Sequence, residues 1–320
     1  MGDSSGRPIV LVAMGGHAFM LRGEAGDIRD HERNAVAICG SLMTLIEREY
    51  NLVVTHGNGP QVGNLLLQNE LTRDSVPSMP LDVLVAHTEG FLGYVLQQAL
   101  LNHLRRRETK RYVVTMITQV LVERDDPAFQ HPSKPIGPFL TQEQAEERRD
   151  RLDWKIIEDS GRGWRRLVAS PRPVRVVQRL MIRDSARAGH IVVACGGGGI
   201  PIIRNQDNDY EGIEAVIDKD LTSSVLAAEI GAELLIILTD VPQVYANYGK
   251  PDQRALGAVT LEEIEALQAE GHFARGSMGP KVEAIVNFLK AGGKRGLITS
   301  PARLTDAMDG RAGTHFIGRI

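Results

Sequence analysis

Short runs of aliphatic and β-branched residues recur along the chain, and most lead into a glycine-containing turn and then an amphipathic stretch. Such runs are typical of strands buried on both faces of a parallel sheet, because they are apolar throughout and do not alternate with polar residues. Helices between parallel strands cover the two faces. The pattern therefore predicts an α/β fold. The expected strands are residues 9–13, 51–55, 113–117, 191–195, 234–238 and 296–299.

The composition supports a folded globular chain and argues against several other classes. Of the 320 residues, 42% are hydrophobic and 24% are charged, so disordered and fibrous classes are excluded. The 37 basic and 40 acidic side chains give a net charge of −3, which argues against binding to nucleic acid or to an anionic membrane. The longest apolar runs have the length of a strand, short of the roughly 18 residues of a membrane span. We expect neither nucleic acid nor a membrane as a partner.

The cysteines and the N-terminal segment bear on the compartment. Two cysteines, Cys39 and Cys195, cannot build a disulfide framework, which fits a reducing environment. Residues 1–8 are polar and lack the apolar core of a signal peptide. These features predict a cytoplasmic location.

One proline-rich stretch, residues 123–175, interrupts the alternation of strands and helices. It contains both tryptophans, Trp154 and Trp164, together with Phe129 and Phe139. The alternative interpretation is a disordered insertion, but these aromatic side chains would supply a small core. We therefore predict a lid subdomain.

Glycine clusters follow three of the predicted strands. Glycine has no Cβ, so backbone N–H groups in such turns are able to approach an anion, and a following helix N-terminus favours negative charge. Ligands of parallel sheets bind beyond the carboxyl ends of the strands, where these turns fall. No turn matches a P-loop or a dinucleotide-binding fingerprint. The clusters are Gly15 and Gly16, then Gly57, Asn58 and Gly59, and then Gly196, Gly197 and the two glycines that follow.

Three lysines are candidates for the positive charge that a phosphate-handling site without a P-loop needs. Lys134, Lys219 and Lys281 each lie in a glycine- or proline-rich segment or between acidic residues. Lysines stabilise a transferring phosphoryl group as point charges. Asp218 and Asp220 flank one of them and are suited either to holding a lysine or to contacting Mg²⁺. For any single lysine, a solvent-facing surface position is the simpler interpretation.

Two histidines, His17 and His56, follow predicted strands and are candidate acid/base groups, although a lone histidine in a turn is more often structural. No Ser-His-Asp or Cys-His arrangement is supported by the spacing, and there is no zinc signature.

Eight motifs, in collinear order over nearly the whole chain, resemble those of the carbamate kinase family within the amino-acid kinase fold. They are residues 55–63 (THGNGPQVG), 90–100 (GFLGYVLQQAL), 131–139 (HPSKPIGPF), 194–201 (ACGGGGIP), 214–221 (EAVIDKDL), 235–245 (LIILTDVPQVY), 271–281 (GHFARGSMGPK) and 312–315 (AGTH).

The resemblance implies an enzyme that reversibly transfers a phosphoryl group between ATP and carbamate, giving ADP and carbamoyl phosphate. It implies a three-layer α/β/α sandwich with a mostly parallel central sheet and a small protruding lid subdomain. We accordingly expect one domain, residues 1–320, with residues 123–175 inserted as the lid. ATP or ADP and Mg²⁺ are the expected cofactors, and the chain is expected to form a homodimer.

The resemblance also implies roles for individual residues. Lys219 and Lys281 would neutralise the transferring phosphoryl group, Asp220 would orient the lysines, and Lys134 would close over the site. The phosphate and acceptor region would be lined by Gly15, Gly16, Gly57, Asn58, Gly59, Gly196 and Gly197. The nucleotide would be bordered by Thr239, Asp240, Val244, Tyr245 and Met278. No metal ligand is assigned.

Two segments depart from the family pattern. The first turn usually reads Gly-Gly-Asn-Ala, but here His17 replaces the asparagine; His17 is expected to donate to the transferring group instead. A second segment, usually Ala-Met-(Ser/Thr)-Gln-Gly, has His87 and Glu89 in place of Met and Gln. One interpretation is neutral drift in an ordinary carbamate kinase. The alternatives are a diverged small acceptor that bears a guanidine or amide group, and a catalytically silent nucleotide-binding homologue.

Overall fold

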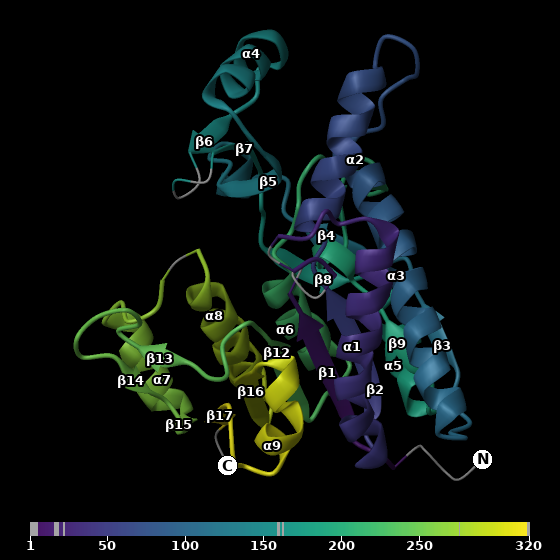
Figure 1. The fold of residues 1–320 in the computed structure, drawn as a ribbon, viewed down its shortest axis with the longest axis vertical. Helices are drawn as coiled ribbons and strands as arrows, with labels where there is room; N and C mark the ends of the chain where they lie inside the picture. The colour runs from purple at the N-terminus through teal and green to yellow at the C-terminus, as the bar shows by residue number, and fades with distance from the viewer. Residues whose placement is uncertain are drawn as a thin grey trace.

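The computed structural model describes residues 6–15, 19–21, 23–158, 161, 163–274 and 276–318, and its centre is one eight-stranded sheet. All of the expected strands form and lie next to one another in it (Figure 1). The order across the sheet is β15-β17-β16-β12-β1-β2-β9-β3. The bounds are β1 (Ile9–Met14), β2 (Asn51–His56), β3 (Val113–Thr115), β9 (Ile191–Val193), β12 (Leu234–Leu238), β15 (Ala258–Thr260), β16 (Arg295–Thr299) and β17 (Thr314–Ile317).

The sheet is parallel from β16 to β3, and β17 is antiparallel to β16. At its centre Leu11 of β1 pairs with Leu235 on one side and with Val53 on the other. Because these strands run the same way, their carboxyl ends meet at one edge of the sheet.

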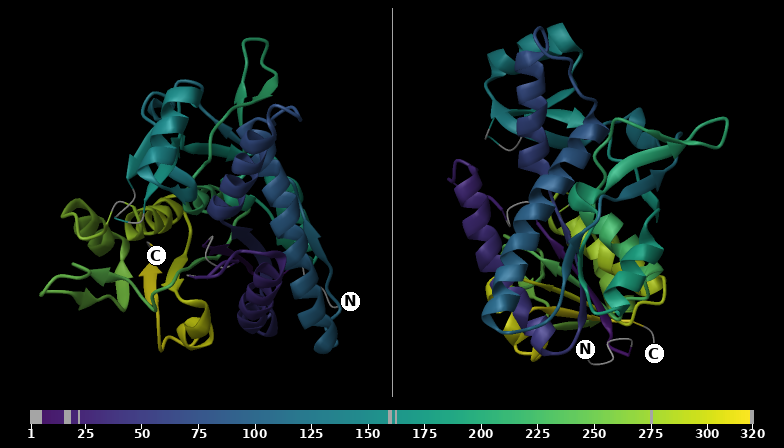
Figure 2. Two further views of the ribbon diagram at one scale, coloured as in Figure 1. Left: turned by 45° about the horizontal axis from the view of Figure 1, so that its top comes forward. Right: turned by 90° about the vertical axis from the view of Figure 1, so that its right-hand side faces the viewer.

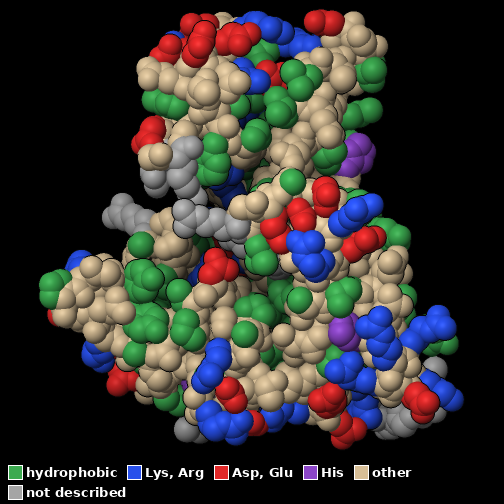
Figure 3. All heavy atoms as spheres, viewed as in Figure 1, with side chains coloured by type: hydrophobic (Ala, Val, Ile, Leu, Met, Phe, Trp, Pro, Cys, Tyr) green, Lys and Arg blue, Asp and Glu red, His purple; other side chains and the backbone are tan. Residues whose placement is uncertain are grey.

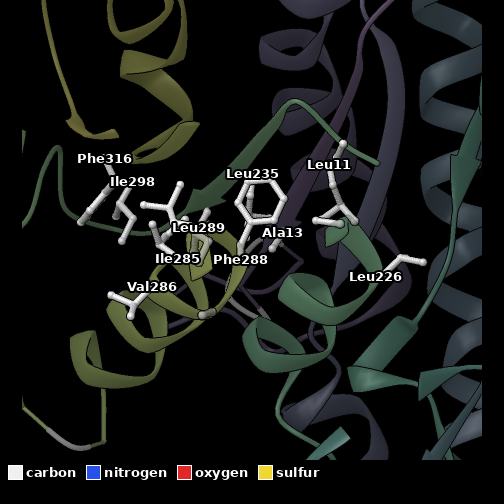
Figure 4. Packing of buried hydrophobic residues seen from close by; sticks show 14 of the residues in the cluster. Leu11, Ala13, Leu226, Leu235, Ile285, Val286, Phe288, Leu289, Ile298 and Phe316 are labelled. Carbon is white, nitrogen blue, oxygen red and sulfur yellow. The ribbon is translucent and has the colours of Figure 1, made fainter. Parts of the chain in front are cut away.

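Successive residues of β1 point to opposite faces, and a layer of helices covers each face. Leu11 and Ala13 pack in one core cluster and Val10 and Val12 in the other. Figure 4 shows the first cluster, where Phe288 packs near Leu235. Figure 2 shows helices on both sides of the sheet. The first face is covered by α5 (Arg179–Arg187), α6 (Lys219–Glu229), α7 (Leu261–Ala269) and α8 (Met278–Lys290), and the second by α1 (Ile28–Glu47), α3 (Leu81–Arg106) and α9 (Leu304–Met308).

The expected three-layer α/β/α sandwich with a mostly parallel sheet is therefore confirmed. No helix in the described part of the chain is long and apolar enough to cross a membrane.

Three smaller sheets accompany the main one among the described residues, and one of them belongs to the proline-rich insertion. The largest has the order β11-β10-β4-β8, and β10 and β11 form a hairpin that projects from the body (Figure 2). The bounds are β4 (Gln119–Val122), β8 (Pro173–Val176), β10 (Ile200–Arg204), β11 (Tyr210–Gly212), β13 (Tyr245–Ala246) and β14 (Arg254–Ala255), the last two forming a two-stranded ribbon.

The proline-rich insertion builds an antiparallel three-stranded sheet and a helix that stand apart from the main sheet, beside α2 (Gly59–Thr72) (Figure 1). We call β5 (Lys134–Leu140), β6 (Ile156–Glu158), β7 (Trp164–Val168) and α4 (Gln142–Leu152) the lid. A capping box of Thr141 and Gln144 starts α4. The boundaries 123–175 for a separate unit stay a prediction.

The packing of the lid differs from the sequence-based expectation. Phe129 packs against the main core, and Phe139 is 45% exposed, so these two rings do not form a lid core. Ile136 and Val168 instead pack with Val62 of α2. The lid is thus stabilised by apolar contact with the body, because a three-stranded sheet with one helix buries too little surface alone.

Candidate active site

The carboxyl ends of β1, β2 and β12 bring three turns together. Met14 pairs with both His56 and Leu238 at the last position of each strand, so Gly15, Gly57 and Thr239 follow side by side. The Gly57 N–H donates to the Met14 carbonyl oxygen at 3.0 Å. The sheet therefore gathers residues that are far apart in the sequence. Gly16 and His17 lie outside the described residues.

A fourth turn, Gly196–Gly199, follows β9 and contains a short 3₁₀ helix, η3 (Gly196–Gly198). Gly197 has φ +67°, and a Cβ there would lie 2.1 Å from Asn58 Nδ2. Glycine is therefore required both for its backbone conformation and for the close approach. The Thr222 hydroxyl of α6 donates to the Gly198 carbonyl oxygen at 2.8 Å, which anchors this glycine loop to the neighbouring helix.

Asn58 is the N-cap residue of α2 and Gly59 is its first residue, so the positive end of the helix dipole lies next to this turn. The Asn58 side chain does not cap the helix; its Nδ2 donates to Thr88 Oγ1 on α3 at 2.8 Å. This contact fixes the asparagine beside the glycine loop.

The lysine cluster is centred on Asp220. Lys219 and Asp220 are the first residues of α6, and Lys281 lies in the first turn of α8. Asp220 is buried and forms ion pairs with both lysines, with 3.2 Å between its Oδ2 and Lys281 Nζ. One carboxylate thus holds two ammonium groups next to each other.

Lys134 reaches the same segment from the lid. Its Nζ donates to the Ile217 carbonyl oxygen at 2.9 Å and lies 3.5 Å from Asp218 Oδ2. The other carboxylate oxygen of Asp218 accepts from the Asp220 amide at 2.9 Å and caps α6. The structure therefore brings together the three lysines and two aspartates singled out in the sequence.

The charges of this cluster shift the pKa values of its members. Burial alone would raise the pKa of Asp218, but Lys134, Lys219 and two backbone amides outweigh burial and hold the pKa at about 2. Burial lowers the pKa of Lys219, and Lys281 lowers it further, whereas Asp220 opposes both. Asp220 therefore helps to keep the Lys219 ammonium protonated.

His56 ends β2 and is buried against the glycine loop. Burial lowers its pKa to about 4, with the nearby Lys219 acting in the same direction and the Gly57 carbonyl opposing them. A Cβ on Gly196 would lie 2.6 Å from His56 Nε2. The imidazole is thus neutral near pH 7 and packs the loop from one side.

A cavity of about 340 Å³ opens beside the lysine cluster, between β12, the β13 segment and the start of α8. Four of the residues expected at the nucleotide, Thr239, Asp240, Tyr245 and Met278, line it together with Gly15 and Lys281. Val244 does not line the cavity; it is fully buried in the core.

Sequence reasoning missed other residues that line the cavity, namely Tyr248, His272, Phe273 and Ser277. The Tyr245 and Tyr248 rings lie 5.8 Å apart. Their spacing of three residues after a strand was the available signal, since it brings two aromatic rings to one side of the turn.

The acidic groups of the cluster offer little to a metal ion. Both carboxylate oxygens of Asp220 are engaged by lysines, and Asp218 is engaged by Lys134 and by amides. Among the residues that the structure describes, no group of three or more His, Cys, Asp or Glu side chains is suited to holding a metal.

Acidic and basic side chains are interspersed over the face of the molecule seen in Figure 3, with no extended patch of one sign. The same view shows a hollow between the lid and the body.

Comparisons with known proteins point to one family over nearly the whole chain. The family model described as "Amino acid kinase family" matches residues 8–300. A carbamate kinase of Thermococcus kodakarensis is 44% identical over 311 residues, which cover 96% of this chain and 98% of that protein. A carbamate kinase-like protein of Escherichia coli, YahI, is 43% identical over 97% of this chain and 99% of its own length.

Solved structures are similar over the same extent. A carbamate kinase from Giardia lamblia bound to AMP-PNP is 40% identical, with a TM-score of 0.91, and the match covers 98% of this chain and 100% of that one. A structure from Aeropyrum pernix is 39% identical, with a TM-score of 0.91, and covers 97% of this chain.

Proposed function

This chain belongs to the amino acid kinase family, and from that premise we propose that it is an ATP:carbamate phosphotransferase. It would transfer a phosphoryl group reversibly between ATP and carbamate, giving ADP and carbamoyl phosphate. The observation that carries the proposal is that carbamate kinases are similar to this chain over nearly its full length. The geometry supports it, because the lysine cluster adjoins both the glycine loops and the cavity.

Lys281 supports the placement of the nucleotide phosphates. Its side chain lines the cavity and also forms an ion pair with Asp220, so its ammonium group lies between the cavity and the lysine cluster. We propose that the nucleotide lies in the cavity with its terminal phosphate directed towards Lys219 and Lys281. Phosphoryl transfer proceeds through a transition state with charge spread over the equatorial oxygens, so positioned ammonium groups are the main protein contribution.

We propose that the acceptor side is formed by the glycine turns at the ends of β1, β2 and β9. Gly57, Asn58 and Gly59 lie at a helix N-terminus, Gly197 faces Asn58, and Gly196 faces His56. Backbone amides at such a position favour an anion such as carbamate or a transferring phosphate. Direct in-line transfer between two substrates held here requires no covalent enzyme intermediate.

Lys134 would act from the lid. Its ammonium group reaches the Asp218 carboxylate while its backbone belongs to β5, so opening of the lid would withdraw a positive charge from the site. We propose that Lys134 closes over the transferring group and is placed there only when the lid contacts the body.

We propose that Mg²⁺ enters as part of the substrate, as MgATP or MgADP. Asp218 and Asp220, the two aspartates of the lysine cluster, are occupied by lysines, so they do not fit the role of a resident metal cage. Mg²⁺ commonly keeps several waters and binds through substrate phosphates.

Burial bears on the alternative of a diverged acceptor. Glu89 is only 1% exposed, so its carboxyl does not reach an acceptor in the site directly. His87 is exposed on α3, and His17, the departure expected to contact the transferring group, lies outside the described residues. We therefore favour carbamate as the acceptor.

The homodimer and the cytoplasmic location are also part of the proposal. Cys39 and Cys195 are both free and buried, which supports a reducing compartment. For the dimer the support is the family resemblance, and light scattering should give twice the mass of the chain.

The reverse reaction tests the proposal: ADP, Mg²⁺ and carbamoyl phosphate are supplied, and ATP is measured. This direction avoids the instability of carbamate in water. We expect a kcat in the ordinary enzyme range of roughly 1–10³ s⁻¹. Absence of ATP formation by protein that still binds ADP would contradict the proposal, and a screen of guanidine- and amide-bearing acceptors would follow.

A further inference from the structure

Glu89 is a buried acidic residue that the mechanism above does not use. It lies in α3, and its Oε2 accepts a hydrogen bond from the Thr118 amide at 2.8 Å. Its Oε1 is buried and has no hydrogen-bond partner among the described residues. Among the residues that the structure describes, no lysine, arginine or histidine forms an ion pair with Glu89. A carboxyl in such a place needs a physical explanation.

The surroundings of Glu89 connect it to the glycine loop. A Cβ on Gly196 would lie 3.0 Å from Glu89 Cγ and 2.6 Å from His56 Nε2, so the loop is held between these two side chains. Thr118, which donates its amide to Glu89, also accepts from the Cys195 amide through its Oγ1 at 3.1 Å. Glu89 therefore touches the start of the loop both directly and through Thr118.

The chemistry of the pocket favours a neutral carboxyl. Ionising a buried acid without a cation costs several kcal/mol, so the group retains its proton instead. Burial raises the pKa of Glu89 well above its usual value, and the Thr118 and Gly196 amides oppose this only in part.

The other titratable groups near Glu89 are uncharged at neutral pH. Burial lowers the pKa of His56, on β2, to about 4, and burial raises the pKa of the Cys195 thiol well above its usual value. Two charges act on these neighbours: the Lys219 ammonium of α6 acts on His56, and the Glu229 carboxylate at the end of α6 acts on the Cys195 thiol. Lys219 is paired with Asp220, and Glu229 is paired with Arg175 and Arg179, so neither compensates a charge on Glu89.

We propose that Glu89 is a positioning residue for the loop 195–199, which it holds in shape as a neutral carboxylic acid, and that its deprotonation sets an alkaline limit on catalysis. The inference rests on the proposed function, in which this loop binds the acceptor and the transferring phosphate. An ionised Glu89 would place a negative charge behind the backbone amides that face those anions and would weaken their binding.

Glu89→Gln is the informative variant, because glutamine has the same shape and stays neutral at every pH. The first measurement is thermal unfolding from pH 5 to pH 9. A raised folded-state pKa means that the wild type loses stability as the pH rises above about 4.5, since the unfolded chain releases the proton first. We expect the Tm of Glu89→Gln to exceed that of the wild type at pH 8 by several degrees, and the gap to narrow towards pH 5. A gap that does not change with pH would overturn the inference.

The second measurement is kcat for ATP formation over the same pH range. We expect the alkaline decline of Glu89→Gln to lie at least one pH unit above that of the wild type. Glu89→Ala should lose about ten-fold or more at every pH while still binding ADP, because the loop loses its support. If the kcat–pH profiles of the wild type and Glu89→Gln superimpose, deprotonation of Glu89 does not set the alkaline limit, and that part of the inference is wrong.

The control is Glu47→Gln, an exposed acid at the end of α1 that should follow the wild type in both measurements. If the wild type itself forms no ATP, the proposed function fails. The unfolding series, which needs no turnover, still decides whether Glu89 is held neutral.

Discussion

Lys281 Nζ on α8 and Asp220 Oδ2 on α6 lie 3.2 Å apart, and this ion pair links the cavity beside β12 to the start of α6. Lys219 occupies the other oxygen of the same carboxylate. The two helices belong to different segments of the chain, and both begin at the same edge of the main sheet. The positive charge needed for phosphoryl transfer is thereby held in place before any substrate binds.

Lys219→Ala should lower kcat for ATP formation by about 10²-fold or more, because a buried ammonium at the transferring group is removed. The reverse assay measures this directly. Lys290→Ala, at the exposed end of α8, is the matched control and should retain wild-type turnover. Near-normal activity of Lys219→Ala would contradict the placement of the phosphoryl group.

Asp220→Asn should destabilise the protein by about 3–5 kcal/mol, because two partly buried ammonium groups lose their carboxylate. The pKa of Lys219, already lowered by burial, should fall further, so the alkaline decline of kcat moves to lower pH. Urea unfolding and a pH–rate profile measure the two effects. Asp207→Asn, on the projecting hairpin, should change neither; an unshifted profile for Asp220→Asn would argue against its role in holding Lys219 charged.

His56 predicts a loss of stability on mild acidification. Its pKa is about 4 in the folded protein and 6.5 ordinarily, so above pH 6.5 both states are neutral and the group contributes nothing. Between pH 6.5 and about 4 His56 is protonated in the unfolded chain but stays neutral in the folded protein. The free energy of unfolding therefore falls by at most roughly 1.4 kcal/mol per pH unit as the pH is lowered. His56→Gln should lack this part of the slope in urea unfolding. Parallel slopes would show that His56 titrates normally in the folded state.

Gly63→Ala tests the contact between the lid and the body. A Cβ at Gly63 in α2 would lie 2.0 Å from Gly137 Cα in β5, so the lid must shift, and overpacking of this kind costs about 1–3 kcal/mol. Because β5 begins with Lys134, we expect kcat for ATP formation to fall several-fold while ADP binding is retained. Gly90→Ala, a helical glycine with open space at its Cβ, is the control. An equal kcat for the two variants would show that catalysis does not depend on the contact between the lid and α2.

Tyr248→Ala should raise the KM for ADP roughly 2- to 10-fold with little change in kcat, because stacking of an aromatic ring contributes about 0.5–1.5 kcal/mol to binding. Tyr248 lines the cavity beside Tyr245 and is 67% exposed. Tyr210→Ala, on the projecting hairpin, serves as the control. An unchanged KM would place the nucleotide elsewhere.

Much of the site was predictable because its residues lie in short segments with strong local signals. The glycine clusters after strands 9–13 and 51–55 and the lysine between Asp218 and Asp220 are visible in the sequence alone. The contact between Lys281 and Asp220 was not, because 61 residues separate them and only the packing of α6 beside α8 brings them together.

Two features of individual residues went against local expectation. Val244 lies next to Tyr245 in the sequence, yet it is buried in the core because neighbouring residues of an extended segment point to opposite sides. Phe139 was expected inside the lid and is exposed. The apolar contact of the lid is made instead by Ile136 of β5 and Val168 of β7, which pack against α2.

The sequence by itself determined the α/β class, the strand positions and the glycine turns and lysines of the candidate site, because these depend on hydrophobic periodicity and on turns a few residues long. The tertiary structure alone decided which charges meet and which acids are buried. Those properties depend on distance and burial, and the burial of Glu89 behind Gly196 follows from how α3, β2 and the loop after β9 pack.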